Sequence, residues 1–106
     1  MKYEILQLDY ENINVQRDHL MFMPWDYVNT KYGFNQWNYK KVYEGEVELK
    51  DTPLRVLEEL YQKFNLHHPE DYTGHSISTS DVVILDGVKY YCDSYGWVNI
   101  DMEKRL

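Results

Sequence analysis

Apolar and polar residues alternate in two segments of the N-terminal half, a pattern that predicts half-buried strands. The first segment is residues 2–8, and the polar stretch that follows over residues 9–18 predicts a connection. The second segment is residues 41–49, where Glu44, Glu46 and Glu48 alternate with Gly45, Val47 and Leu49. Because one face of this strand carries three glutamates, we expect that face to contact water.

Two segments have features that predict helices. Thr52 and Pro53 provide an N-cap and a first-turn proline for a main helix over residues 52–64. One face of this helix is apolar, and we expect it to be buried; it consists of Leu54, Leu57, Leu60, Tyr61 and Phe64. A short helix over residues 24–33 is predicted from the proline at its start and the glycine at its end.

The C-terminal third predicts a β-meander. The apolar run at residues 82–85 is a strand of the buried type, and Asp86-Gly87 after it favours a two-residue hairpin turn. Residues 88–93 return as the partner strand, and residues 97–100 form a last short strand. The polar tail at residues 101–106 is expected to fray. The whole pattern predicts an α+β fold in one domain over residues 1–106: a small, mostly antiparallel sheet with the main helix 52–64 and the short helix 24–33.

Length and charge restrict the classes of function. The chain has 106 residues and a formal net charge of −7. Binding to a nucleic-acid backbone or to an anionic membrane favours basic surfaces, so we expect neither partner. The longest apolar runs are shorter than the ~20 residues that span a bilayer. The single cysteine, Cys92, excludes an intrachain disulfide and favours a reducing, cytoplasmic location.

One loop concentrates residues that could carry chemistry. His67, His68 and His75 lie near Glu70 and Asp71, but their spacing matches no familiar zinc pattern, so we expect no metal and no cofactor. Cys92 is expected to be buried and inert, because its sequence neighbourhood is not electropositive.

The same loop contains a serine-rich run. His75, Ser78 and Asp81 could act as base, nucleophile and orienting acid, and a small hydrolase is one alternative function. All three lie in one short loop without a nucleophile elbow, so we expect no enzyme. Serine and aspartate at such a junction commonly hydrogen-bond backbone groups. We therefore expect a structural motif made of Gly74, His75, Ser76, Ser78, Ser80, Asp81 and Gly96.

Acidic residues are the other candidate for function. Between residues 66 and 103 the sequence contains seven acidic residues and only one lysine or arginine, Lys89. Carboxylates on every second strand residue lie about 7 Å apart, close to the spacing of phosphates along a nucleic-acid strand, about 6–7 Å. An acidic face could therefore mimic DNA, or it could be an edge strand protected from aggregation by charge. The candidate partner-binding acids are Glu44, Glu46, Glu48, Glu70, Asp71, Asp86, Asp93 and Asp101.

Two segments carry a family resemblance. Residues 74–85, GHSISTSDVVIL, and residues 90–97, YYCDSYGW, resemble two sequence blocks of the YodL-like domain of Firmicutes and their mobile elements. Weaker likeness over residues 3–8, 19–22 and 39–45 extends the resemblance to most of the chain. The chain differs from the family pattern at Ile77, Thr79, Cys92, Tyr95 and Trp97. The resemblance implies a genomic setting, with no cofactor or reaction attached.

Together these observations predict a non-enzymatic, acidic protein-binding module. The specific hypothesis is a mobile-element inhibitor of a host nucleic-acid-binding defence protein, of the anti-CRISPR or anti-restriction, DNA-mimic type. Its partner would be a basic protein such as a nuclease. One alternative is an interaction or regulatory domain acting on a cytoskeletal or cell-shape protein, and the other is the hydrolase built on His75, Ser78 and Asp81.

Overall fold

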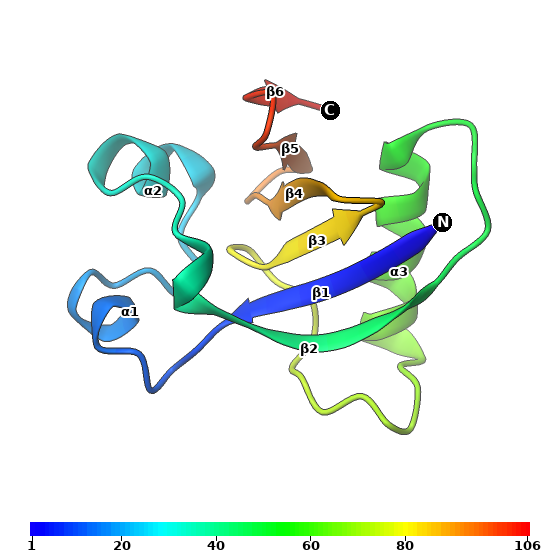
Figure 1. The fold of residues 1–106 in the computed structure, drawn as a ribbon, viewed down its shortest axis with the longest axis horizontal. Coiled ribbons are helices and arrows are strands. Elements are labelled where there is room, and N and C mark those ends of the chain that lie inside the picture. Colours follow the sequence, from blue (N-terminus) through cyan, green and yellow to red (C-terminus); the bar gives the residue numbers. More distant parts are fainter.

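A single six-stranded antiparallel sheet organises the chain, as Figure 1 shows. The computed structural model describes residues 1–106. The strands have the spatial order β2-β1-β3-β4-β5-β6. Their bounds are β1 Lys2–Leu8, β2 Tyr39–Glu46, β3 Val82–Leu85, β4 Val88–Cys92, β5 Trp97–Asn99 and β6 Lys104–Arg105. The helices are α1 Ile13–Arg17, α2 Trp25–Lys31 and α3 Pro53–Leu66, with a 3₁₀ turn, η1, at Gln36–Asn38. The α+β prediction with one main helix is therefore confirmed.

The main helix α3 begins where the sequence indicates. The Thr52 side chain accepts a hydrogen bond from the Arg55 backbone N–H at 3.3 Å, and Pro53 occupies the first turn, where its missing N–H leaves no bond unmade. The helix continues to Leu66, two residues beyond the predicted end. Its buried side chains include Val56, while Tyr61 remains 41% exposed. The prediction that Tyr61 lies on the buried face was wrong, because the buried stripe is centred on Val56, Leu57, Leu60 and Phe64.

One helix and one strand, as well as the turn η1, were not expected from the sequence. Helix α1 lies inside the polar stretch 9–18, where the Asn12 side chain caps the Asn14 N–H at 2.8 Å and only Val15 is buried. Strand β6 lies in the tail that was expected to fray, and it pairs with β5. Both elements are short and are held by contacts distant in sequence, so periodicity does not reveal them.

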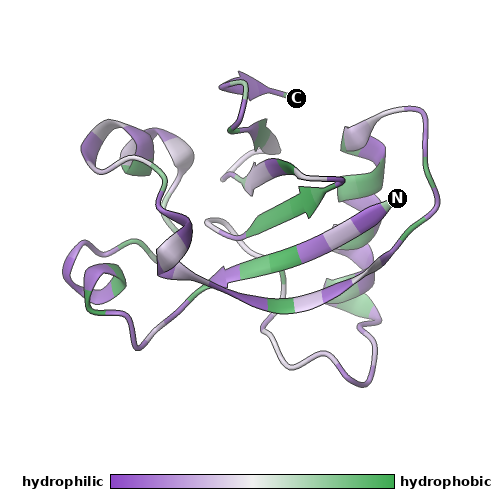
Figure 2. Ribbon diagram, in the orientation of Figure 1, coloured by the Kyte–Doolittle hydropathy of each residue, from purple (hydrophilic) through white to green (hydrophobic).

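The sheet is covered on both faces. Figure 1 shows α3 on one side of the strands and α1 and α2 on the other. One core cluster joins α3 to Ile5, Val83 and Tyr90, and the second joins α1 and α2 to Leu6, Val82 and Tyr91. All four residues of β3 are buried, and Figure 2 shows this strand as hydrophobic along its length. A strand buried on both faces needs apolar residues at successive positions, not alternate ones.

The strand predicted over residues 41–49 both begins and ends earlier in the structure. As β2 it covers Tyr39–Glu46, so Glu48 lies beyond the strand. It is an edge strand paired only with β1, with a register shift between Ile5 and Leu6. Glu44, Glu46 and Glu48 are all exposed, as the alternation predicts.

Candidate functional site

A buried glutamine organises the histidine- and serine-rich loop. Gln7 points from β1 into the α3 side of the sheet and is 2% exposed. Its Nε2 lies 2.9 Å from the His75 carbonyl, 3.1 Å from the Tyr72 hydroxyl and 3.0 Å from Asp81 Oδ2. Its Oε1 accepts the His75 backbone N–H at 3.1 Å. This one side chain therefore fixes the loop to strand β1.

Close packing around Gln7 explains the glycine at position 74. A Cβ atom on Gly74 would lie 2.6 Å from Gln7 Oε1 and 2.7 Å from the Tyr72 hydroxyl oxygen. Neither atom can move away without breaking the hydrogen bonds around His75. Gly74 is therefore required by a close approach, whereas Gly96 has a φ of +79° that suits a glycine turn.

Asp81 is the buried acid of this cluster. Its Oδ2 also accepts the Ser78 backbone N–H at 2.9 Å, and the carboxyl is 1% exposed. Burial raises the pKa of Asp81 to about 7, although the Ser78 N–H, His75 and Gln7 all favour the charged form. Asp81 Oδ1 faces His75 Nε2 at 3.9 Å, and that nitrogen is buried without a hydrogen-bond partner.

The serines of the loop bond to backbone groups. The Ser78 hydroxyl donates to the Ser76 carbonyl at 2.9 Å, and Ser80 Oγ accepts the Phe22 backbone N–H at 3.1 Å. His75 Nδ1 contacts the Ser76 carbonyl at 2.7 Å. The arrangement brings His75 and Asp81 together but directs the Ser78 hydroxyl elsewhere. A nucleophile needs a base within hydrogen-bond reach, and this geometry does not supply that contact.

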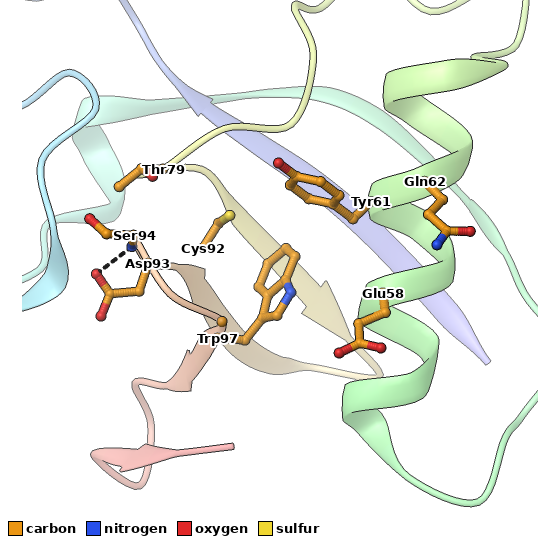
Figure 3. Close-up of a pocket in the computed structure, with 9 residues that line it drawn as sticks. Glu58, Tyr61, Gln62, Thr79, Cys92, Asp93, Ser94 and Trp97 are labelled. Atoms are coloured by element: carbon orange, nitrogen blue, oxygen red, sulfur yellow. Dashed lines mark hydrogen bonds between the residues drawn. The ribbon is translucent and has the colours of Figure 1, made fainter.

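A cleft lies between α3 and the β4–β5 turn, and Figure 3 shows its lining. Its volume is about 310 Å³. Both segments that resemble the YodL-like family contribute to it. The lining residues are Glu58, Tyr61, Gln62, Thr79, Cys92, Asp93, Ser94, Gly96 and Trp97. The rings of Tyr61 and Trp97 and the carboxylate of Glu58 point into the space between helix and strands. Tyr95, at the tip of the turn, is 93% exposed.

The thiol in this cleft is expected to be unreactive. Cys92 is buried, and burial raises its pKa to about 12, with the Asp81 and Asp93 charges acting in the same direction. Since the thiolate is the nucleophile, folded protein at pH 8 should incorporate no iodoacetamide in an hour, whereas protein in 6 M guanidinium should be fully alkylated. Mass spectrometry measures both, and rapid labelling of the folded chain would contradict the burial of Cys92.

The eight candidate acids divide into two groups. Four have a cationic partner in the chain: Glu44 pairs with Lys41, Glu48 with Lys50, Asp93 with Arg105 and Asp101 with Lys89. The other four are exposed and lie in no ion pair: Glu46, Glu70, Asp71 and Asp86. Asp71 accepts the Tyr43 hydroxyl and Asp86 accepts the Lys2 backbone N–H, and neither donor group is charged.

Asp93 does not belong to an acidic surface, because it is 6% exposed. Its Oδ1 accepts the Trp25 backbone N–H at 3.0 Å, the first amide of α2, where Pro24 provides no side-chain cap. Burial alone would raise the pKa of Asp93, but hydrogen bonds from Trp25, Arg105 and Ser94 hold it below its usual value. Its role as a partner-binding acid is therefore corrected to that of a cap joining α2 to the β4–β5 turn.

Sequence reasoning missed the residues that organise both regions. Gln7 follows Tyr3 and Ile5 at two-residue spacing, so a polar residue at a core-facing position was the available signal. Glu58 and Trp97 had no such signal, because their proximity depends on how α3 packs against the sheet. No group of three or more histidine, cysteine, aspartate or glutamate residues is placed to hold a metal ion. None of the helices combines the length and the apolar character that crossing a membrane requires.

One of the comparisons with known proteins identifies the family. The family model of the YodL-like domain matches residues 2–102, which is nearly the whole chain. No curated protein and no solved structure matches the chain. The matched range includes every strand of the sheet except β6, as well as all the helices and the lining of the cleft. The chain therefore belongs to the YodL-like domain family.

Proposed function

We propose that this domain is a non-enzymatic module that binds a basic protein in the cytoplasm through its exposed carboxylates. The observation that carries the proposal is the set of four exposed acids without a cation of the chain, Glu46, Glu70, Asp71 and Asp86. A net charge of −7 in 106 residues adds a long-range field of the same sign. Such a field increases the association rate with a positively charged partner.

Two of these acids lie close together across the sheet. Glu46 is the residue opposite Lys2 on β2, and Asp86 accepts the Lys2 backbone N–H from the other side of β1. Neighbouring strands are 4.7–4.9 Å apart, so the two acidic residues are separated by about 10 Å across the strand axes. The exposed Lys2 lies between them on β1 and forms no ion pair with either acid. We call Glu46 and Asp86 the negative margin and propose it as the docking surface.

The proposed partner is a nucleic-acid-binding protein of a host defence system, such as a CRISPR or restriction nuclease. Such proteins carry basic grooves that neutralise phosphates. Exposed carboxylates on a small rigid sheet can occupy a groove of this kind and compete with the nucleic acid. The resemblance to domains of mobile elements supplies the biological reason for such an inhibitor.

The test is binding to a purified CRISPR nuclease and to a purified restriction endonuclease from Gram-positive bacteria. Biolayer interferometry at 100 and 500 mM NaCl should show binding to one of them that weakens with salt and is competed by duplex DNA. A bacterial cytoskeletal filament protein serves as the comparison partner. Absence of nuclease binding, or binding indifferent to salt and DNA, would overturn the proposal, and binding to the filament protein alone would favour the regulatory alternative.

Charge-matched variants separate a docking margin from net charge. Glu46→Gln with Asp86→Asn should weaken binding roughly tenfold. A tenfold change in Kd corresponds to about 1.4 kcal/mol, and we expect the two lost contacts together to contribute about this much. Glu11→Gln with Glu103→Gln removes the same charge from two other exposed acids and should change the Kd less than twofold. Equal weakening by the two double variants would show that only the net charge matters.

A further inference from the structure

The cleft of Figure 3 combines aromatic walls with one uncompensated carboxylate. Tyr61 on α3, 41% exposed, and Trp97 on β5, 4% exposed, supply the rings, so most of the accessible aromatic surface belongs to Tyr61. Of the two carboxylates in the lining, Asp93 is held by Arg105 at 2.6 Å, whereas Glu58 is exposed and lies in no ion pair. Glu58 is therefore the one negative charge in the cleft that the chain leaves free.

The cations on the same helix are occupied elsewhere. Arg55, one turn before Glu58, pairs with Asp51 at 3.4 Å. Lys63 lies over the Phe64 ring, with its Nζ 5.7 Å from the ring centroid. No basic residue lines the cleft. Neither cation of α3 pairs with Glu58, and the one cation bound to a lining residue, Arg105, is held by Asp93.

The lining also fits the chemistry of a guanidinium group. A guanidinium stacks on aromatic faces and donates paired hydrogen bonds to a carboxylate. Glu58 and Tyr61 lie on the helix wall of the cleft, and Trp97 lies on the strand wall. Cys92 at the floor stays neutral at physiological pH, because burial raises its pKa, and so it adds no competing charge. The exposed Tyr95 beside the opening provides further contact area for the segment that carries the cation.

We propose that this cleft is the receptor for one arginine side chain of the partner protein, with the guanidinium stacked on the exposed Tyr61 ring and paired with the Glu58 carboxylate. The identity of the partner as a basic protein rests on the proposed function. The cleft adds a specific anchor to the negative margin. It lies between α3 and the β4–β5 turn, and neither Glu46 nor Asp86 lines it.

The test uses the peptide acetyl-Gly-Arg-Gly-amide as the probe and the full chain labelled with ¹⁵N. Titration should shift the amide signals of Ser94 and Gly96 and the indole signal of Trp97. The matched peptide with citrulline in place of arginine keeps the shape of the side chain and lacks its charge. It should produce no saturable shift at the same concentrations.

Two neighbouring acids on α3 provide matched variants. Glu58→Gln should weaken the arginine peptide about five- to tenfold, since a charge-assisted contact is lost. Glu59→Gln removes the same charge one residue away, where the carboxylate faces Lys50 at 3.8 Å, and should change the Kd less than twofold. Both side chains are exposed, and thermal melts verify that both variants fold.

The outcomes distinguish this proposal from the proposed function. Equal weakening by Glu58→Gln and Glu59→Gln, or equal binding of the citrulline peptide, would overturn the arginine receptor. If a nuclease binds and the two variants weaken it equally, the receptor fails while the protein-binding function stands. If the arginine peptide binds in the cleft but no basic protein binds the chain, the proposed partner fails while the cleft retains its specificity for arginine.

Discussion

Truncating Phe64 to alanine is expected to lower the free energy of unfolding by about 3–5 kcal/mol. Phe64 is 1% exposed, and its ring packs edge-on against Tyr3, Tyr43 and Tyr72, at centroid distances between 4.8 and 6.2 Å. Its removal takes away apolar burial and leaves a cavity that these rings cannot fill without moving from the loop and the strands that hold them. Urea unfolding followed by tryptophan fluorescence measures the change.

The matched variant is Tyr61→Ala on the same helix. Tyr61 is 41% exposed, so its truncation should cost below about 1.5 kcal/mol. The pair distinguishes the observed buried face of α3 from the face that periodicity predicts, which includes both residues. Similar losses for the two variants would contradict the observed orientation of the helix.

Neutralising Asp81 is expected to change how stability depends on pH. Burial raises the pKa of Asp81 to about 7, well above the value near 3.9 of an aspartate in the unfolded chain. For an acid shifted in this direction, the folded state binds the proton more tightly than the unfolded state does. The stabilisation is fully present below the unfolded pKa and is lost as the pH rises through the folded value. Between pH 5 and pH 8 the wild type should therefore lose roughly 2–3 kcal/mol that Asp81→Asn does not lose.

Asparagine is a suitable replacement because of the geometry around the carboxyl group. Both protein hydrogen bonds to the carboxylate, from Gln7 and Ser78, end on Oδ2, which the amide oxygen can replace. The amide NH₂ then takes the place of Oδ1, which faces the unpartnered His75 Nε2 at 3.9 Å. Urea unfolding at pH 5, 6, 7 and 8 provides the measurement. Glu70→Gln, an exposed acid of the same loop, is the control and should follow the wild-type curve. Parallel curves for the wild type and Asp81→Asn would show that Asp81 is not a titrating buried acid.

Much of the fold could be predicted from local sequence. Thr52-Pro53 marks the start of α3, Asp86-Gly87 marks the β3–β4 turn, and the alternating glutamates mark the exposed face of β2. These features depend on neighbours a few residues away, which the sequence presents directly. Helix α1 and strand β6 were missed, because a polar five-residue helix and a two-residue strand carry no hydrophobic period.

The candidate sites could be predicted from the sequence only in part. The loop at residues 74–81 stood out by composition, but its organising residue, Gln7, lies 74 positions before Asp81. The acids of the C-terminal half stood out by charge, but Asp93 is a buried cap for α2. The pairing of Glu44 and Glu48 with lysines left Glu46 as the unpaired member of that row. Composition identifies which groups are present, whereas their partners depend on chain segments brought together by folding.

The sequence by itself determined the main helix, most of the strand segments, the acidic character and the family resemblance, because each depends on residue types and short spacings. Only the tertiary structure decided that β1 lies between β2 and β3, that both faces of the sheet are covered, and that Glu58 shares a cleft with Trp97. The physical reason is that these features are set by contacts between distant segments. Such contacts form when the apolar faces of two segments pack together, and the sequence of one segment does not specify which other segment it will pack against.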